Sequence, residues 1–338
     1  MSDELKTITS LNKGYELGVI LGNAGKDAVH NHLVHEPFWQ HVQKLSESEI
    51  VQNLHEQTAK HFPDIYDEIR GLSDGLELPF ESVFAWNCRG DILVNSPDGC
   101  TTLQIPGDPN VIAHNEDGLP SLDQTCFLID CRAEAGFMSF CYPGSIPGHS
   151  FACTRSGLAV TINNIRLTDF TPKLPRMVLA RAVLNCEDLQ AVCELLERHN
   201  LSGGFHYSVA QIGRRELLSI EHGGGNCHIT EIQTPTGHAN HVSTVRCDKQ
   251  LITQSSDDRY ERTQELLKDP SLSPLDILRD NSGDGLPIWR REKDDPDDEN
   301  TIASIIFQVG KEQLSWEIYS GSSRDLLHSG QVAIQTTP

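Results

Sequence analysis

The chain is expected to form an α+β protein in which antiparallel sheets lie between layers of helices. Residues 1–99 have mostly helical patterns, whereas residues 100–247 are rich in short strands that are interrupted by helical spacing at 174–199. The final stretch contains a helix near 257–268 and two closing strands. Helices, strands, paired helices and strands again, in this order, are typical of layered α+β proteins.

Helix starts and interruptions can be placed in the first stretch. Glu36-Pro37 begins one helix, and residues 46–61 have helical spacing. Phe62-Pro63 interrupts that pattern, and residues 64–75 resume it. Pro79 precedes the apolar residues of a further helix, so residues 1–99 are predicted to be largely helical.

Short apolar runs separated by turn residues predict the strands. These runs lie at 111–115, 125–131, 137–141 and 158–163, with closing strands at 301–308 and 314–319. Residues 207–212 and 217–221 are expected to form a hairpin around Gly213-Arg214-Arg215, and Gly223-Gly224-Gly225 a turn rather than a phosphate loop, because no Gly-Lys-Ser/Thr follows.

Composition excludes several classes of protein. The net charge of −21 over 338 residues argues against a nucleic-acid partner, which needs a basic surface. No apolar run is long enough to span a membrane, and the first residues do not have the pattern of a signal peptide. The ten cysteines have no paired metal spacing. We therefore expect a cytoplasmic protein with reduced thiols and with neither a metal nor a cofactor.

Cys100 is the residue with the most informative position. It follows a turn-like segment ending in Gly99 and opens an alternating run, so a Gly-Cys peptide bond lies at a loop-to-strand junction. Such a thiol can attack the preceding carbonyl carbon and release a new N-terminal cysteine. That residue combines a thiol with an α-amine of unperturbed pKa roughly 7.7–8.0. The alternative is a buried thiol that packs as a small apolar side chain.

Six blocks of sequence carry a resemblance to a known family. They are residues 68–71, 87–89, 98–102 (Asp-Gly-Cys-Thr-Thr), 115–117 (Asn-Glu-Asp), 156–163 and 238–241 (His-Ala-Asn-His). In this order and spacing they resemble the N-terminal-nucleophile (Ntn) hydrolases of the acyl-CoA:6-aminopenicillanic-acid and isopenicillin-N acyltransferase type. Relatives of these enzymes hydrolyse β-alanyl amines.

The resemblance implies a fold and a maturation step. The fold is a four-layer αββα sandwich, with two antiparallel sheets flanked by helices. Cleavage between Gly99 and Cys100 would leave an α chain of residues 1–99 and a β chain of 100–338 that remain associated in one globular domain. The partners implied are this α chain and a small amide substrate, with a homo-oligomer possible.

The resemblance also implies the catalytic residues. Cys100 is the expected nucleophile. Asp117, 17 residues later, would return beside it through a hairpin and hold the α-amine, although Asp117-Gly118 alone is also a plausible turn. Asn240 would donate to the developing oxyanion. Asn163 would orient Cys100 or bind substrate, the alternative being a turn at the end of its strand.

Further residues are expected at the edge of the site. Thr101 could assist self-cleavage, Glu116 replaces the family's tryptophan and makes the acyl pocket more polar, and His149 and Tyr207 line the pocket.

Two other clusters are interpreted as solvated surface. They are the histidines at positions 30, 32, 35 and 41, and the acidic run 294–299, for which calcium binding is the alternative.

The sequence therefore predicts a self-processing amidohydrolase that cleaves a small N-acyl or aminoacyl amide, such as a β-alanyl amide, through a thioester on Cys100. One alternative is an acyltransferase that moves an acyl group to an amine. A second is a non-catalytic homologue that kept the fold. A papain-like site is excluded because no Cys-Gly-Ser-Cys-Trp type neighbourhood is present.

Overall fold

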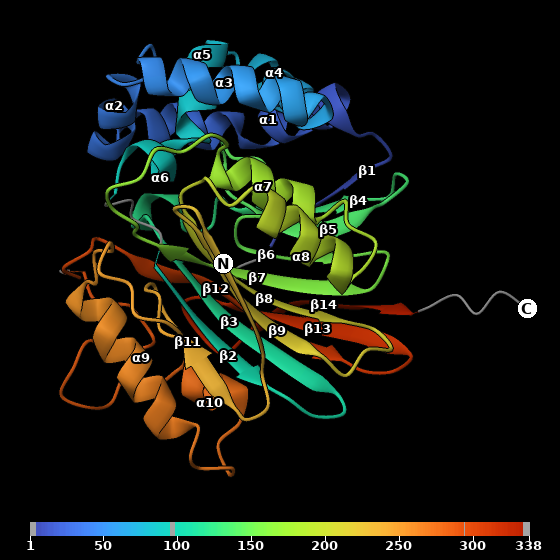
Figure 1. Cartoon of the computed structure of the whole chain (residues 1–338), viewed down its shortest axis with the longest axis vertical. Coiled ribbons are helices and arrows are strands. Elements are labelled where there is room, and N and C mark those ends of the chain that lie inside the picture. Colours follow the sequence, from blue (N-terminus) through green and yellow to red (C-terminus); the bar gives the residue numbers. More distant parts are fainter. Residues whose placement is uncertain (1–4, 95–98, 294, 334–338) are drawn as a thin grey trace, which may run out of the picture.

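Four layers form the molecule, as Figure 1 shows: helices, an eight-stranded sheet, a six-stranded sheet and helices. The computed structural model describes residues 5–94, 99–293 and 295–333. Helices α7 and α8 cover the eight-stranded sheet, with the N-terminal helices above them, and α9 and α10 cover the six-stranded sheet. The expected αββα architecture is confirmed.

The helices agree with the expected positions and add several to them. In chain order they are α1 (Gly14–Asn31), α2 (Pro37–Gln43), α3 (Glu49–His61), α4 (Pro63–Leu76), α5 (Phe80–Trp86), α6 (Arg89–Ile92), α7 (Arg176–Val183), α8 (Leu189–Arg198), α9 (Gln254–Leu266) and α10 (Pro274–Leu278), with short 3₁₀ turns η1 (Leu33–His35) and η2 (Pro120–Leu122). Proline is at the first position of α2, α4 and α10, where its missing N–H costs no hydrogen bond.

The eight-stranded sheet departs in one place from the expected antiparallel pattern. Its order is β1 (Thr7–Ser10), β4 (Phe127–Cys131), β5 (Phe137–Cys141), β6 (Phe151–Thr154), β7 (Leu158–Ile165), β8 (Gly204–Gln211), β9 (Leu217–Gly223) and β10 (Asn226–Glu231). The expected hairpin of β8 and β9 is present. The first strand, which the sequence analysis missed, pairs in parallel with β4. A parallel pair is possible here because the N-terminal helices and two strands intervene between its members.

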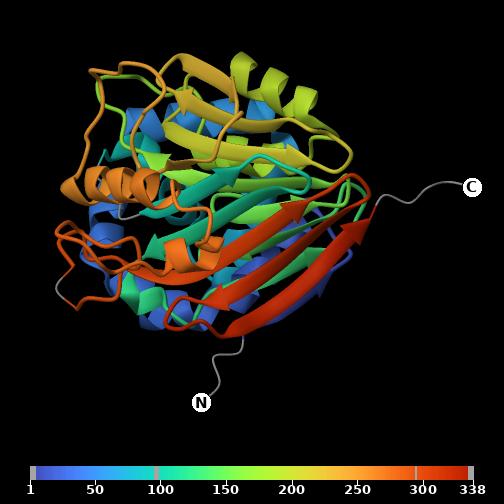
Figure 2. The same cartoon turned by 90° about the horizontal axis from the view of Figure 1, so that it is seen from below.

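All neighbours in the six-stranded sheet are antiparallel. Its order is β11 (Thr236–His238), β2 (Cys100–Ile105), β3 (Asn110–Gly118), β12 (Asn300–Val309), β13 (Gln313–Ser320) and β14 (Leu326–Ala333). Figure 2 shows the last three strands side by side along one half of this sheet. Strand β14 was not predicted, because polar residues and Gly330 occupy much of it.

Helix α1 was also not predicted individually, because glycine lowers helix propensity. Its glycines instead allow a close approach to α4: a Cβ on Gly18 would lie 1.9 Å from the carbonyl oxygen of Glu68, and a Cβ on Gly71 would lie 1.9 Å from that of Tyr15. Packing of the two backbones therefore stabilises a helix that local propensity disfavours. Among the described residues, no helix is both long enough and apolar enough to cross a membrane.

Segments on either side of residue 99 are tied together by buried polar contacts. Glu68 of α4 accepts hydrogen bonds from Arg181 of α7, the shortest of 2.9 Å. Asp91 of α6 accepts from the backbone N–H groups of Arg176 (3.1 Å) and Gly203 (2.7 Å). These contacts pack α4 and α6 of the N-terminal segment directly against α7 and against the residue that precedes β8.

Candidate active site

The β2–β3 hairpin places Cys100 directly opposite Glu116. Strand β2 begins at Cys100, as the alternating pattern predicted, whereas the turn-like segment expected before Gly99, at 95–98, lies outside the described residues. Both side chains are 3% exposed, and the thiol Sγ lies 3.8 Å from Glu116 Oε2. A thiol hydrogen bond at this length is ordinary for sulfur, so the carboxylate is positioned to accept the proton of the thiol.

Glu116 is the centre of a buried hydrogen-bond network. Its Oε2 accepts from Ser150 Oγ (2.6 Å) and lies 3.1 Å from His114 Nε2, and its Oε1 accepts from the hydroxyl of Tyr142 (2.8 Å). Burial, together with the charge of Glu116, raises the pKa of Tyr142 well above its usual value, so this hydroxyl remains a donor. Gly118 makes room for it, since a Cβ there would lie 2.6 Å from the tyrosine oxygen.

A second chain of contacts connects the two sheets. Thr102 Oγ1 lies 2.7 Å from His114 Nδ1 and donates to Asn163 Oδ1 of β7, also at 2.7 Å. The same Asn163 oxygen lies 3.2 Å from His206 Nδ1, and the His206 ring stacks on His238 with centroids 3.5 Å apart. Asn163 therefore lies near Cys100, where it contacts Thr102 rather than Cys100 itself.

Asn240 holds the backbone nitrogen of Cys100. Its Oδ1 accepts from the Cys100 N–H at 3.0 Å and from Arg259 at 2.6 Å. Its Nδ2 donates to the carbonyl oxygen of Asn164 at 3.0 Å. The sequence analysis expected an oxyanion donor at this position. In the uncut chain the side-chain oxygen of Asn240 instead fixes the nitrogen that would become the α-amine.

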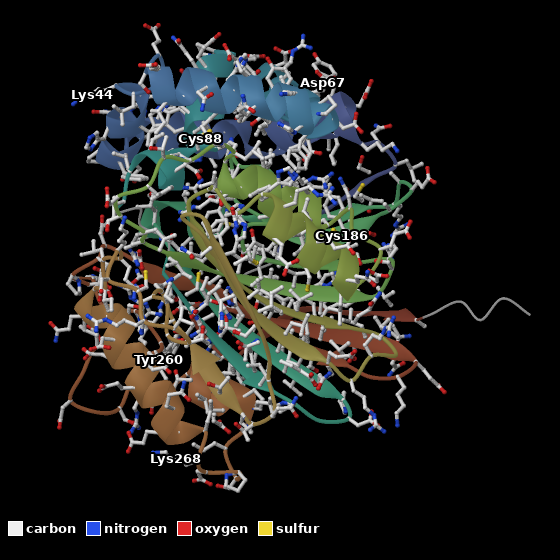
Figure 3. All side chains as sticks on the ribbon, in the orientation of Figure 1. Lys44, Asp67, Cys88, Cys186, Tyr260 and Lys268 are labelled. Carbon is white, nitrogen blue, oxygen red and sulfur yellow. The ribbon has the colours of Figure 1, made fainter. Side chains whose placement is uncertain are left out.

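Arg259 of α9 is a site residue that the sequence analysis missed. It is 1% exposed, and its Nη1 donates to the carbonyl oxygen of Cys100 (2.5 Å) and to Thr101 Oγ1 (2.9 Å). The helix is held over the site by Tyr260, marked in Figure 3, whose ring lies 5.1 Å from that of His241. The sequence contained no signal for this arginine, because α9 is strongly polar throughout.

Asp117 contacts the Gly99–Cys100 junction through its backbone. Its N–H donates to the carbonyl oxygen of Gly99 at 2.9 Å. Its side chain is directed to the other face of β3 from that of Glu116, where Oδ1 accepts from Thr301 at 2.7 Å. Burial raises the pKa of Asp117, although the charges of Arg290 and Arg259 oppose that shift. The hairpin returns the backbone of Asp117 to the junction, whereas its carboxylate, which was expected to hold the Cys100 nitrogen, contacts Thr301, and Asn240 contacts that nitrogen.

Buried charges surround Gly99. A Cβ on this residue would lie 2.1 Å from Glu299 Oε2 and 2.7 Å from Arg290 Nη1, so a side chain here would collide with this buried ion pair. Burial raises the pKa of Glu299 to about 7, even though the adjacent guanidinium of Arg290 lowers it. This carboxyl group therefore titrates in the neutral range next to the peptide bond at Gly99.

The acidic run at 294–299 was interpreted as a solvated loop, but in its described part only Pro296 and Asp298 are exposed. Asp295, Asp297 and Glu299 all pair with Arg290, which is only 1% exposed. Asp294 lies outside the described residues. A buried guanidinium requires charge compensation, and these carboxylates supply it.

The remaining predicted site residues lie at different distances from Cys100. Thr101 is directed toward α9 and contacts Arg259. His149 packs on Tyr142, with ring centroids 5.3 Å apart, and so lies next to the Glu116 network. Tyr207 is fully buried on the helix-facing side of β8, where its ring lies 6.0 Å from His222, which in turn contacts α8. The structure therefore places Tyr207 outside the cluster.

Two clusters bear on metal binding. His30, His32, His35 and His41 are exposed, in agreement with a solvated surface. In contrast, Cys100, His114 and Glu116 bring a thiol, an imidazole and a carboxylate within 4.8 Å of one another. Sequence spacing did not indicate this second group, because its members meet through strand pairing. No disulfide joins any two of the ten cysteines, all of which lie within the described residues.

Comparison with known proteins identifies the family of the chain. Residues 105–325 match the acyl-coenzyme A:6-aminopenicillanic acid acyl-transferase family. A β-alanyl-dopamine/carcinine hydrolase from Drosophila melanogaster is 23% identical over 348 aligned positions, covering 89% of each chain.

Two solved structures are also similar. A conjugated bile acid hydrolase from Clostridium perfringens is 9% identical, with a TM-score of 0.43 over 71% of this chain and 93% of its own. A penicillin V acylase from Agrobacterium tumefaciens is 13% identical, with a TM-score of 0.39 over 70% and 86%. The expectation of an enzyme for amide hydrolysis or acyl transfer is confirmed. The chain belongs to the acyl-coenzyme A:6-aminopenicillanic acid acyl-transferase family.

Proposed function

We propose that the protein is a self-processing cysteine amidohydrolase that cleaves its own Gly99–Cys100 bond and then hydrolyses small aminoacyl amides through a thioester on Cys100. The observation that carries the proposal is the arrangement at the start of β2. There the thiol contacts Glu116 at 3.8 Å, and Asn240 accepts from the Cys100 N–H at 3.0 Å. The proposed nucleophile therefore lies next to a buried proton acceptor, and a second buried side chain holds the nitrogen of the scissile bond.

Self-cleavage begins with attack of Cys100 Sγ on the carbonyl carbon of Gly99, while the thiol proton passes to Glu116. The Asp117 N–H, already 2.9 Å from the Gly99 oxygen, stabilises the negative charge that develops there. The C–N bond then breaks, the nitrogen takes up a proton, and a thioester joins Gly99 to Cys100 Sγ. Water hydrolyses this thioester, which leaves a carboxyl group on Gly99 and a free thiol and α-amine on Cys100.

Turnover uses the same sulfur with a different base. The new α-amine accepts the thiol proton, Sγ attacks the substrate carbonyl, and the amine product leaves with a proton. Water then releases the acyl group. Arg259, which contacts the Cys100 carbonyl at 2.5 Å, and Asn240 keep the residue oriented after its peptide bond is cut. The buried pairs Glu68–Arg181 and Asp91–Arg176 hold the two products of cleavage together.

The substrate class is inferred from the similar β-alanyl-dopamine/carcinine hydrolase. We infer an amide whose acyl part is a short amino acid and whose amine is a small biogenic amine. A chain with a net charge of −21 and a carboxylate beside the nucleophile favours such cationic ends over anionic ones. Equal rates with matched cationic and anionic amides would contradict this substrate class and leave the nucleophile assignment intact.

Acyl transfer is a second candidate, favoured by the description of the matched family. Hydrolysis and transfer share the thioester and differ in whether water or an amine attacks it. Adding a primary amine to the reaction distinguishes them, because a transferase converts it to an amide product whereas a hydrolase releases free acid at an unchanged rate.

The intact mass of the purified protein under denaturing conditions tests the proposal. Two masses that fit a break between Gly99 and Cys100 are expected, together with one mass and no amidase activity for Cys100→Ala. Cys153→Ala is the control, because burial raises the pKa of that thiol to about 12 and it lies outside the site. A single mass in an enzyme that still hydrolyses amides would overturn self-processing. Cleavage or activity in Cys100→Ala would overturn the nucleophile.

A further inference from the structure

The thiol, imidazole and carboxylate next to the scissile bond form a cluster on one face of two paired strands. Cys100 pairs with Glu116, and Thr102 pairs with His114, so His114 and Glu116 project on the same side of β3. Their ligand atoms and the Cys100 sulfur all lie within 4.8 Å of one another, and all three residues are buried. A cluster fixed by strand pairing is held more rigidly than one on loops.

Hydrogen bonding determines which nitrogen of His114 faces the cluster without a proton. Thr102 has one hydroxyl proton and gives it to Asn163 Oδ1, so its oxygen accepts from His114 Nδ1 at 2.7 Å. An uncharged His114 therefore carries its proton on Nδ1 and presents a bare Nε2. That nitrogen lies 3.1 Å from Glu116 Oε2. Two lone-pair atoms at this separation require a positive charge between them, either a proton or a metal ion.

The separations fit a zinc ion. Tetrahedral Zn²⁺ with its usual bond lengths places a sulfur and an oxygen ligand about 3.6 Å apart and a nitrogen and an oxygen ligand about 3.4 Å apart. The corresponding distances here are 3.8 Å between Cys100 Sγ and Glu116 Oε2 and 3.1 Å between His114 Nε2 and the same oxygen. Shifts of a few tenths of an ångström would bring these two separations to the tetrahedral values, and a thiol with an imidazole is a donor set that favours zinc over magnesium or calcium.

The surrounding residues already orient these ligands. Thr102 fixes the imidazole ring through Nδ1, and the Tyr142 hydroxyl and Ser150 Oγ fix the carboxylate of Glu116. Partners of this kind commonly raise metal affinity 10- to 100-fold. Three protein ligands also leave a fourth position open, as at zinc sites that bind water or a further ligand.

We propose that Cys100, His114 and Glu116 form a zinc-binding site in which the metal reversibly blocks the nucleophile. Binding of Zn²⁺ releases the thiol proton and the proton between His114 and Glu116, and it forms a Zn–S bond that withdraws charge from the sulfur and holds it away from the carbonyl carbon it would attack. The metal takes no part in catalysis. Zinc is therefore an inhibitor of self-cleavage and of turnover, and a chelator restores both.

Titration of metal-free protein with Co²⁺ tests the site without relying on activity. We expect one Co²⁺ per chain with a thiolate-to-cobalt absorption band, displaced by Zn²⁺. His114→Gln and Glu116→Gln should weaken binding by more than about 100-fold, beyond the usual effect of a residue that only orients a ligand. Thr102→Val, which keeps all three ligands, should weaken it by about 10- to 100-fold. Cys153→Ala should leave it unchanged.

The same titration also gives the results that would overturn the proposal. The absence of a band in the wild-type chain, or its persistence in Cys100→Ala, would overturn the site. Circular dichroism of each variant separates a lost ligand from a lost fold, and Thr102→Val provides a test in which no ligand is removed. The inhibition rests on the proposed function, whereas the cobalt band does not. A band in a protein without amidase activity would support the metal site and refute only the proposed function.

Discussion

Cys100 and Glu116 face each other across the first pair of the β2–β3 ladder, with the thiol 3.8 Å from the carboxylate. Ser150, Tyr142 and His114 contact the same carboxylate, so its position is determined from three further directions. A carboxylate held this firmly beside a nucleophile accepts its proton without first reorganising, which is the condition under which general-base catalysis is efficient.

Glu116→Gln should slow self-cleavage by about 10²- to 10⁴-fold, the range usual for loss of a general base. The amide keeps the shape of the side chain but accepts a proton poorly, and the time course of fragment appearance on a denaturing gel measures the change. Glu317→Gln is the matched control, since Glu317 also accepts from a tyrosine hydroxyl, at 2.6 Å, but lies on β13. An unchanged rate in Glu116→Gln would show that the thiol proton takes another route.

Gly99→Ala should slow self-cleavage by about 100-fold, the cost of misplacing reacting atoms by roughly 1 Å. The added Cβ would lie 2.1 Å from Glu299 Oε2, so the Gly99 carbonyl must shift away from Cys100 Sγ. The measurement is the time course of fragment appearance on a denaturing gel. Gly310→Ala is the control, because its nearest new contact is an ordinary 3.4 Å. Cleavage of Gly99→Ala at the wild-type rate would contradict this account of the junction.

Arg259→Lys should destabilise the chain by about 1.5–3 kcal/mol for each charged hydrogen bond that is lost. The planar guanidinium contacts the Cys100 carbonyl, Thr101 and Asn240 together, and an ammonium group cannot reproduce that geometry. Urea unfolding measures the change. Arg324→Lys, at an exposed ion pair, should change stability by less than about 1 kcal/mol. Equal effects of the two substitutions would argue against the structural role of Arg259.

Glu299 should make stability depend on pH. Its pKa is raised from 4.5 to about 7 in the folded chain, so folding favours the protonated form. The stability it contributes is therefore complete below pH 4.5, falls as the pH rises to about 7 and is absent above that. The change is at most about 3 kcal/mol, at 1.36 kcal/mol for each pKa unit.

Urea unfolding between pH 4 and 8 tests this dependence, with Cys100→Ala as the background that keeps the chain uncut. Glu299→Gln should remove the decline between about pH 4.5 and 7, because an amide does not titrate. Glu265→Gln, which removes an exposed carboxylate of α9, should retain it. Parallel curves for the Glu299→Gln variant and its parent would contradict the assignment.

Tyr207→Phe should leave activity unchanged and raise stability. The hydroxyl of this tyrosine is buried without a hydrogen-bond partner, which costs about 1–3 kcal/mol. The side chain faces the helical layer near His222 and not the Cys100 cluster. Thermal unfolding and steady-state kinetics check the two expectations. A fall in kcat/KM with unaltered stability would indicate that Tyr207 lines the substrate pocket after all.

Local patterns were sufficient for much of the fold. Short apolar runs between turn residues placed β5 at its observed residues and indicated the β8–β9 hairpin, and proline marked the starts of α2, α4 and α5. Strand β1 and helix α1 were missed, because four residues are too short for a period and glycine disfavours a helix locally. Their stability depends on β4 and α4, with which they pair and pack.

By itself, the sequence indicated the Gly99–Cys100 junction as a candidate site, and the resemblance to the acyltransferase family added Asp117, Asn163 and Asn240 as its proposed neighbours. Only the tertiary structure decided which charges meet there. Arg259 reaches the carbonyl of Cys100 across 159 residues of sequence, and the acidic residues that seemed solvated compensate a buried arginine. Hydrophobic periodicity indicates which face of a strand is buried. Which polar groups share that burial depends on how the layers stack, since each buried charge needs a partner from another element.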